Sequence, residues 1–449
     1  MIDKNTVSNL NLTDITRVFC INEKQCGYVV EVLSSIEKSP EIIRKKQEIV
    51  KDFVNNPDFF LDCKNVLAQF EGVISERKTV KRLSFQPRSI YEANQRKKTR
   101  TTFGNLSDIS KMLLKYIRLY VNMSNLFNKY NFKSEYMTDL KEYFVNFATK
   151  ESFQKFGNVI NQLSNIEVEN SNICMNVLLD KEIGKIHVFF VSVNGEKQSP
   201  GIEFVNQTDT EIITRLTGVA VKDLCDYLND IVEIMEDKLL SFYDELMFYR
   251  FAIRYIEELK ERGLPISYPD IADENDKIHF NELYSIELIA KNLTKIVPHD
   301  IELSRFTVLH GDNNTGKTCY VRSVALAYIF AQAGLPLPAI SGVISPVTNI
   351  LSQFAVGEKN LGRFEEEVSE VSEIVDKVNS KTLIIFNETF QSTVYEEIAQ
   401  PYMDILEGIV SAGGHALVVS HNEMFIELCT KKTDVTLLKM DNEHKIINS

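Results

Sequence analysis

The sequence predicts two parts: a mostly α-helical region over residues 1–275, and an α/β domain with a largely parallel sheet over residues 276–449. In the first part apolar residues recur at intervals of three and four, which is the spacing of one helix face. In the second part short apolar runs alternate with helical patterns around a glycine-rich loop, as in parallel sheets. At 449 residues the chain is longer than one compact core usually allows, so we expect two or three domains.

The helical region contains one predicted β insertion, over about residues 173–205. Apolar residues there indicate short strands, and Asn194-Gly195 is a dipeptide that favours a hairpin turn. Two long helical patterns, residues 139–156 and 210–255, are equally consistent with lever arms or with a bundle that binds no ligand.

The α/β domain follows a predicted linker at residues 263–282, where two prolines break the helical pattern. Apolar runs of strand length lie at residues 305–310, 382–386 and 416–420. Residues 323–357 contain no charged residue, as would a membrane span. Glycine and proline interrupt this run, so we expect a buried helix that leads into a loop, and no membrane partner.

Composition narrows the possible functions. The net charge of −13 gives no general indication of nucleic-acid binding, so a bound duplex would need a local basic face. The seven cysteines are scattered without a CxxC pair, which argues against a disulfide framework or a structural zinc and favours a reducing cytosol. The N-terminus lacks the charged-then-apolar order of a signal peptide, so we expect a cytoplasmic protein.

Residues 311–318 match the phosphate-loop pattern G-x-x-x-x-G-K-[ST]. Glycines let backbone N–H groups approach phosphate oxygens, the lysine places a charge at the β- and γ-phosphates, and the last hydroxyl reaches Mg²⁺. A chance match is the alternative, but the pattern lies between a predicted strand and a predicted helix, as the function requires. We therefore predict ATP and Mg²⁺ as cofactors. The expected ATP-binding residues are Gly311, Asp312, Asn313, Asn314, Thr315, Gly316, Lys317, Thr318 and Cys319.

A second polar element follows at residues 383–388, an apolar run that ends in Asn387-Glu388. In phosphate-loop ATPases such a strand ends in an Asp that holds Mg²⁺ and a Glu that polarises the attacking water. Here Asn387 takes the metal position beside Thr318 without a negative charge, and Glu388 takes the position of the base. The alternative is an ordinary buried strand with polar end residues. His421, after the next predicted strand, is either a structural histidine or a sensor of the γ-phosphate.

The segment from Ile296 to Ala339 closely resembles the ATPase domain of the MutS family of DNA mismatch-repair proteins. The likeness extends past the phosphate loop into a helix that a generic phosphate-loop protein would not share. The resemblance implies an ABC-type P-loop ATPase domain with Glu388 and His421 as catalytic residues, and it adds Ile296, Pro298 and His299 to the nucleotide-binding set. Matching positions after the loop are Tyr320, Arg322, Val324, Ala325, Leu326, Ala331, Gln332, Gly334, Pro338 and Ala339.

Residues 1–275 resemble, more loosely, the helical core and lever segments that precede this ATPase domain in the family. The resemblance implies that ATP brings two ATPase domains together, as a homodimer, and that levers transmit this change to a DNA clamp. The family's Ser-Thr-Phe signature, which reaches the partner's ATP, is Gly362-Arg363-Phe364 here. The chain shows no counterpart of the N-terminal mismatch-reading and connector domains and ends 28 residues after His421. We therefore expect no direct mismatch recognition and only part of the C-terminal dimerisation element.

A local basic run lies at residues 77–100 of this acidic chain. Such a run is either a surface that follows DNA phosphates or a solvated face without a ligand. The candidate DNA contacts are Arg77, Lys78, Lys81, Arg82, Arg96, Lys97, Lys98 and Arg100, and Arg88 belongs to the same run.

Two functions remain. The first is a MutS-like ATPase that couples ATP binding and hydrolysis to DNA binding, in mismatch repair, recombination or another DNA-repair process. The second is a nucleotide-gated interaction protein with weak or no hydrolysis that does not act on mismatches. Asn387 and the missing signature serine favour the second, whereas Lys317, Glu388 and His421 favour the first. A chromosome-structural ATPase would need a sustained heptad coiled coil, which the sequence lacks.

Overall fold

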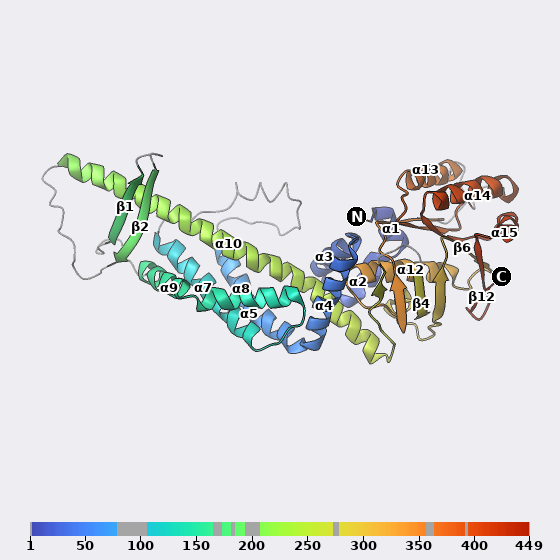
Figure 1. Cartoon of the computed structure of the whole chain (residues 1–449), viewed down its shortest axis with the longest axis horizontal. Coiled ribbons are helices and arrows are strands. Elements are labelled where there is room, and N and C mark those ends of the chain that lie inside the picture. Colours follow the sequence, from blue (N-terminus) through green and yellow to red (C-terminus); the bar gives the residue numbers. More distant parts are fainter. Residues whose placement is uncertain are drawn as a thin grey trace. The chain divides into compact units, whose positions relative to one another are not determined.

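The structure, a computed structural model (Figure 1), groups the chain into two compact units, Met1–Asn55 with Met247–Ser449, and Asn56–Leu246. The grouping differs from the boundary expected at residue 275, because the N-terminal helices and the end of the last long helix pack with the α/β domain. The structure describes residues 2–78, 106–164, 173–180, 185–193, 207–272, 278–355, 363–390 and 394–448.

The unit Asn56–Leu246 is mainly helical, with a core of aromatic side chains. The ring of Phe127 stacks on Phe144 with centroids 5.5 Å apart and meets Phe59 edge-on at 5.2 Å. Such ring pairs stabilise beyond the apolar area that they bury. The elements are α5 (Pro57–Lys78), α7 (Leu106–Asn128), α8 (Glu135–Thr149), α9 (Glu151–Ser164), β1 (Ile173–Asp180), β2 (Lys185–Val193) and most of α10 (Gln207–Glu261).

The single helix predicted over residues 139–156 is wrong: α8 and α9 are separate helices. Lys150 between them has an extended backbone, with φ −61° and ψ 129°, and its carbonyl accepts the hydrogen bond from the N–H of Phe153 that starts α9. No glycine or proline marks this break, which occurs because both helices pack on α7. The helix predicted over residues 210–255 is confirmed within α10.

The β insertion is confirmed as an antiparallel hairpin, in which Val177 of β1 lies opposite Val188 of β2. Residues 181–184 lie between the two strands in the sequence, so the turn predicted at Asn194-Gly195 does not join this pair. That dipeptide follows β2 and lies outside the described residues.

Four short helices begin the other unit: α1 (Lys4–Asn9), α2 (Leu12–Phe19), α3 (Glu23–Ser34) and α4 (Pro40–Asn55). The side chains of Asp3 and Asn22 cap α1 and α3 by accepting backbone N–H bonds, as N-cap residues do. The ring of Phe19 contacts Tyr255 of α10 with centroids 5.6 Å apart, and Tyr255 contacts Phe330 of α12 (Lys317–Gln332) at 5.2 Å. Figure 1 accordingly shows α3 beside α12, while α2 contacts α11 (Ile286–Ala290).

The larger sheet has the strand order β12-β11-β6-β10-β9-β8. All neighbouring pairs are parallel except β11 with β12, so the largely parallel sheet predicted from the sequence is confirmed. β9 and β10 are buried along their whole length, which explains their continuous apolar runs. The strands are β6 (Phe306–Gly311), β8 (Asn349–Phe354), β9 (Thr382–Asn387), β10 (His415–Val419), β11 (Thr436–Met440) and β12 (Ile446–Asn448).

A second, four-stranded sheet of mixed direction has the order β3-β7-β4-β5. Two of its strands lie in or overlap the expected linker at residues 263–282, so that expectation is corrected. The strands are β3 (Asp270–Ile271), β4 (Ile278–Leu283), β5 (His299–Leu303) and β7 (Ser341–Ile344). The helices of the domain are α11 (Ile286–Ala290), α12 (Lys317–Gln332), α13 (Arg363–Val375), α14 (Tyr395–Ser411) and α15 (Glu423–Thr430).

The charge-free run forms the buried helix α12, as predicted, and then β7 and β8 rather than a simple loop. Gly334 ends the helix with φ +86°, and a Cβ there would lie 2.6 Å from the Cβ of Lys46. Only glycine fits this close approach between α12 and α4. Among the described residues, no helix has the length and apolar character that crossing a bilayer demands.

Candidate functional site

The phosphate-loop pattern forms a tight connection from the end of β6 to the start of α12. Gly311 has φ +140°, and a Cβ at that position would collide with the carbonyl oxygen of Met440 on β11. Gly316 has φ +100° and caps α12 in the left-handed conformation. Both ends of the loop therefore adopt backbone conformations that favour glycine, and the first end also lies too close to β11 for any side chain.

Lys317 lies inside the curve of this loop. Its Nζ donates to the carbonyl oxygens of Gly311 at 3.0 Å and Asp312 at 2.6 Å, and the hydroxyl of Thr315 donates to the same Asp312 carbonyl at 2.9 Å. Burial lowers the pKa of the Lys317 ammonium, while the charges of Glu388 and Asp312 oppose that change. The loop thus holds a buried cation through its own carbonyls, and stronger acceptors such as phosphate oxygens would compete for it.

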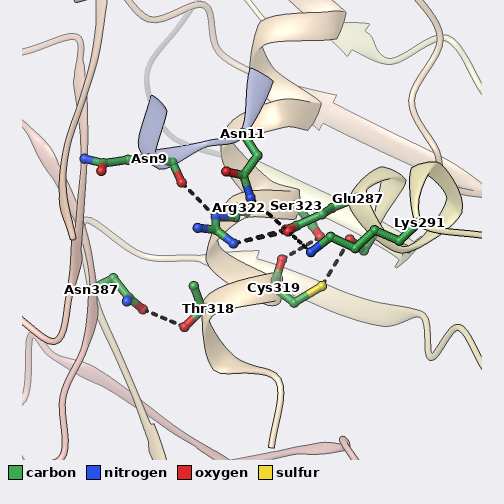
Figure 2. A network of polar contacts seen from close by, with 10 residues as sticks. Asn9, Asn11, Glu287, Lys291, Thr318, Cys319, Arg322, Ser323 and Asn387 are labelled. Atoms are coloured by element: carbon green, nitrogen blue, oxygen red, sulfur yellow. Dashed lines mark hydrogen bonds and ion pairs between the residues drawn. The ribbon is translucent and has the colours of Figure 1, made fainter. Parts of the chain in front are cut away.

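The two residues predicted to hold a metal lie side by side in the structure (Figure 2). The hydroxyl of Thr318, in the first turn of α12, donates to Oδ1 of Asn387 at 3.1 Å. Asn387 is the last residue of β9 and is buried. Both are neutral oxygen donors of the kind that Mg²⁺ accepts, but neither supplies a negative charge.

Glu388 and His421 also form a pair, from the ends of the adjacent parallel strands β9 and β10. Nε2 of His421 donates to Oε1 of Glu388 at 2.9 Å, and each side chain is about a quarter exposed, at 21% and 27%. Glu388 has φ +60°, an unusual conformation for a glutamate, and its N–H bonds the carbonyl of Val419. Non-glycine residues in this region are strained and occur at functional sites more often than elsewhere.

Lys317, Thr318 and Glu388 line one cavity of about 620 Å³. Asn387 and His421 do not line it but contact Thr318 and Glu388, which do. The loop and α12 form one wall, α11 forms another, and Glu388 closes the cavity beside the loop. The lining residues include Asn313, Asn314, Gly316, Lys317, Thr318, Cys319, Glu287, Leu288, Lys291 and Arg322. The site residues that the sequence predicted on separate elements are thus brought together by the order β6-β10-β9, since carboxyl ends of parallel strands share one edge.

The predicted binding residues before the loop, Ile296, Pro298 and His299, do not line the cavity. His299 begins β5 and packs its ring against Tyr320 of α12 with centroids 5.5 Å apart. Burial lowers the pKa of His299, and the nearby His444 lowers it further. Ile296 is half-buried and Pro298 exposed, and neither lines the cavity.

His444 is a site residue that sequence reasoning missed. It lies in the turn between β11 and β12 with φ +66°, and its Nδ1 donates to the carbonyl of Thr315 at 2.7 Å. The pairing of Met440 with Gly311 brings this turn to the loop. No sequence motif surrounds His444, so its place beside the loop is evident only from the order of the strands.

Two predicted groups are only partly described. Of the signature-position residues, Phe364 is 40% exposed and contacts the ring of Phe390, the side chain of Arg363 is not described, and Gly362 lies outside the described residues. Arg77 and Lys78 end α5 with side chains that are not described. The other basic candidates, Lys81, Arg82, Arg88, Arg96, Lys97, Lys98 and Arg100, lie outside the described residues.

Comparison of the sequence with known proteins shows which family the chain is similar to. Residues 307–448 match the family model described as MutS domain V. The chain is 26% identical over 214 residues to the DNA mismatch repair protein MSH3 of Candida glabrata, which covers 42% of this chain and 21% of that protein. It is 24% identical over 253 residues to the DNA mismatch repair protein MutS of Chlamydia pneumoniae, covering 49% and 31%. It is 31% identical over 158 residues to MutS of Caldicellulosiruptor saccharolyticus, covering 33% and 18%. The matches therefore span less than a third of each of these relatives.

Proposed function

We propose that this chain, which belongs to the MutS family of DNA mismatch-repair proteins, is an ATPase that couples ATP binding and hydrolysis to DNA binding. One observation carries the proposal: Lys317, Thr318 and Glu388, from two elements far apart in sequence, line a single cavity. The matched MutS domain V contains all three residues. An ABC-type ATPase domain accounts for both the cavity and the parallel sheet beneath it.

The phosphate loop supplies the binding of ATP in this proposal. The amides between Gly311 and Thr318 and the amino end of α12 attract phosphate oxygens. Lys317 is already oriented, because the carbonyls of the loop hold its ammonium in place. Binding would exchange those neutral acceptors for phosphate oxygens, whose negative charge adds a direct attraction to the ammonium.

The hydroxyl of Thr318 and the amide oxygen of Asn387 fit a magnesium ion by chemistry, since both are oxygen donors and they lie 3.1 Å apart. When bound, Mg²⁺ would neutralise charge on the β- and γ-phosphates. With Asn in place of Asp the protein contributes no negative charge at this position. We therefore expect the chain to bind Mg²⁺ weakly and mainly together with ATP.

Glu388 would orient and deprotonate the water that attacks the γ-phosphorus, so that the γ-phosphate leaves as inorganic phosphate and ADP remains. His421 donates to one carboxylate oxygen of Glu388. This hydrogen bond fixes the direction of the carboxylate and holds the imidazole beside Glu388, through which it can report the state of the γ-phosphate.

A second function is favoured by one observation, the neutral pair Thr318–Asn387. An ATPase that lacks the metal carboxylate can bind nucleotide and hydrolyse it slowly or not at all. The chain would then be a nucleotide-gated interaction protein, whose partner binding depends on ATP without turnover.

Steady-state hydrolysis separates the two functions. Glu388→Gln should lower the turnover of ATP by about 10²-fold or more, the usual scale for a lost general base, while ATP still binds. Lys317→Ala should abolish ATP binding and serves as the control for a lost site. By family analogy Phe364 would face a second copy of the chain when ATP is bound. Because Glu388→Gln should keep ATP bound without hydrolysing it, this variant with ATP should also sediment as a dimer. Equal, near-zero turnover in the wild type and Glu388→Gln would leave only the nucleotide-gated function.

The metal position is tested by restoring the missing charge. Asn387→Asp should lower the Mg²⁺ concentration that half-saturates ATP binding roughly tenfold, because a carboxylate attracts the ion more strongly than an amide. Asn55→Asp, at the exposed end of α4, makes the same chemical change away from the cavity and should have no effect. An unchanged Mg²⁺ requirement in Asn387→Asp would remove this position from the site.

The DNA-binding part of the proposal rests on the relatives, which are DNA mismatch repair proteins by name, and on the basic run of the sequence. Replacing Lys97, Lys98 and Arg100 together by Glu should weaken binding to DNA and reduce its dependence on salt, since each lost phosphate contact removes about one unit from the slope of log K against log [salt]. Mismatched, branched and single-stranded probes, with and without ATP, are the appropriate substrates. An unaltered salt slope would mean that the run is a solvated surface.

A further inference from the structure

A buried polar network ties the N-terminal helices to the helix that follows the phosphate loop (Figure 2). At its centre is Glu287 on α11, which is 3% exposed. Its Oε1 accepts hydrogen bonds from Nζ of Lys291 at 2.7 Å, from Nδ2 of Asn11 at 3.0 Å, and from the guanidinium of Arg322 at 3.2 Å. The network therefore contains one carboxylate, two cations and an asparagine from the turn between α1 and α2.

Arg322 joins this network to the cavity. It lies one helical turn after Thr318 on α12 and lines the same cavity as Lys317. Its Nε donates to the carbonyl of Asn9, at the end of α1, at 2.8 Å. Its guanidinium also lies over the ring of Phe354, the last residue of β8, 5.2 Å from the ring centroid. One side chain thus contacts α1, α11 and β8 from the first turns of the phosphate-loop helix.

The helix α1 is attached to β8 by a second set of hydrogen bonds. The hydroxyl of Thr6, which is fully buried, accepts the backbone N–H of Ser352 at 3.0 Å. The side-chain amide of Asn9 donates to the carbonyl of Ser352 at 3.2 Å and to its hydroxyl at 3.1 Å. β8 pairs with β9 so that Phe354 lies opposite Asn387. The N-terminal segment therefore contacts the strand beside the metal position as well as Arg322.

The charges of Glu287, Lys291 and Arg322 oppose a movement of only one of these residues. Burial acts to raise the pKa of Glu287, but the hydrogen bond from Lys291 and the charge of Arg322 outweigh it and hold that pKa below its usual value. The carboxylate is thus ionised and buried, and separating it from a cation would leave an uncompensated charge. Asn11 adopts φ +51°, a left-handed conformation that asparagine tolerates better than most residues. A shift of α12 must consequently carry Glu287 and the α1–α2 turn with it.

We infer that Arg322 is a positioning residue of the nucleotide site, through which α1 and α2 respond to the nucleotide. The inference rests on the proposed function, because it needs ATP at Lys317 and Thr318. Phosphate binding at the amino end of α12 acts on the first turn of the helix. Arg322, in the next turn, transmits that change to Asn9 and Glu287, and Asn11 couples Glu287 to the start of α2.

Hydrogen exchange of the full chain, with and without ATP and Mg²⁺, tests this coupling. In the wild type the amides of α1 and α2 should exchange about tenfold more slowly with ATP, because the network restrains their local opening. In Arg322→Gln, at an ATP concentration that saturates this variant in a direct binding measurement, the nucleotide response should fall to less than about twofold. Arg322→Lys, which keeps the charge beside Glu287 but loses the forked geometry, should restore part of the response.

Two further variants separate coupling from simple structural damage. Asn11→Gly is compatible with the left-handed turn and removes the side chain with its amide, so it should reduce the response without loss of folding. Arg17→Gln removes the exposed ion pairs of Arg17 with Asp14 and Glu23 on the same segment and should leave the response intact. A wild type that binds ATP without any change in α1 and α2, or an Arg322→Gln that keeps the full response, would overturn the coupling alone. Failure of the wild type to bind ATP would overturn the proposed function and the coupling with it.

Discussion

The site depends on one constraint: the backbone from Gly311 to Lys317 folds tightly around the buried ammonium group of Lys317. Glycine is required at Gly311 because the carbonyl of Met440 occupies the space of a side chain, and at Gly316 because the loop enters α12 in the left-handed conformation. The ammonium of Lys317 donates hydrogen bonds to the carbonyls of Gly311 and Asp312 within this loop. A buried ammonium without hydrogen-bond acceptors would be costly, so these two carbonyls hold Lys317 inside the loop before an anion binds.

The order of the strands converts this loop into a site. β6 lies next to β10, and β10 next to β9, so the residues that follow them meet at one edge of the sheet. Asn387 thereby reaches Thr318, and His421 reaches Glu388. In our proposal these two contacts have different consequences: the neutral pair limits the affinity for the metal, whereas the His–Glu pair preserves the geometry of a general base. Slow turnover with firm, ATP-dependent binding is the behaviour expected of such a combination.

Sequence alone predicted the parts whose chemistry is local. The loop, the apolar strands β6, β9 and β10, and the polar residues at their ends follow from spacing and periodicity. His444 could not be predicted, because its contact with Thr315 depends on the pairing of β11 with β6. The break at Lys150 was also missed, since tertiary packing and not a strong local signal decides it.

The network around Arg322 illustrates the same limit. The identity of Arg322 suggested a family likeness, but its partners Asn9 and Glu287 lie 313 and 35 residues away along the chain. The packing of α1 on β8 and of α2 on α11 brings them together, and the N-terminal residues accordingly group with the α/β domain.

The claim that the loop holds a polyphosphate is tested most directly by competition between nucleotides for the wild-type chain, with a fluorescent ATP analogue as the probe. The account predicts that ATP displaces the analogue at least about tenfold more effectively than AMP, because most of the charge-assisted hydrogen bonds go to the β- and γ-phosphates. Equal displacement by ATP and AMP would contradict it, since Lys317 and the loop amides would then contribute nothing to binding.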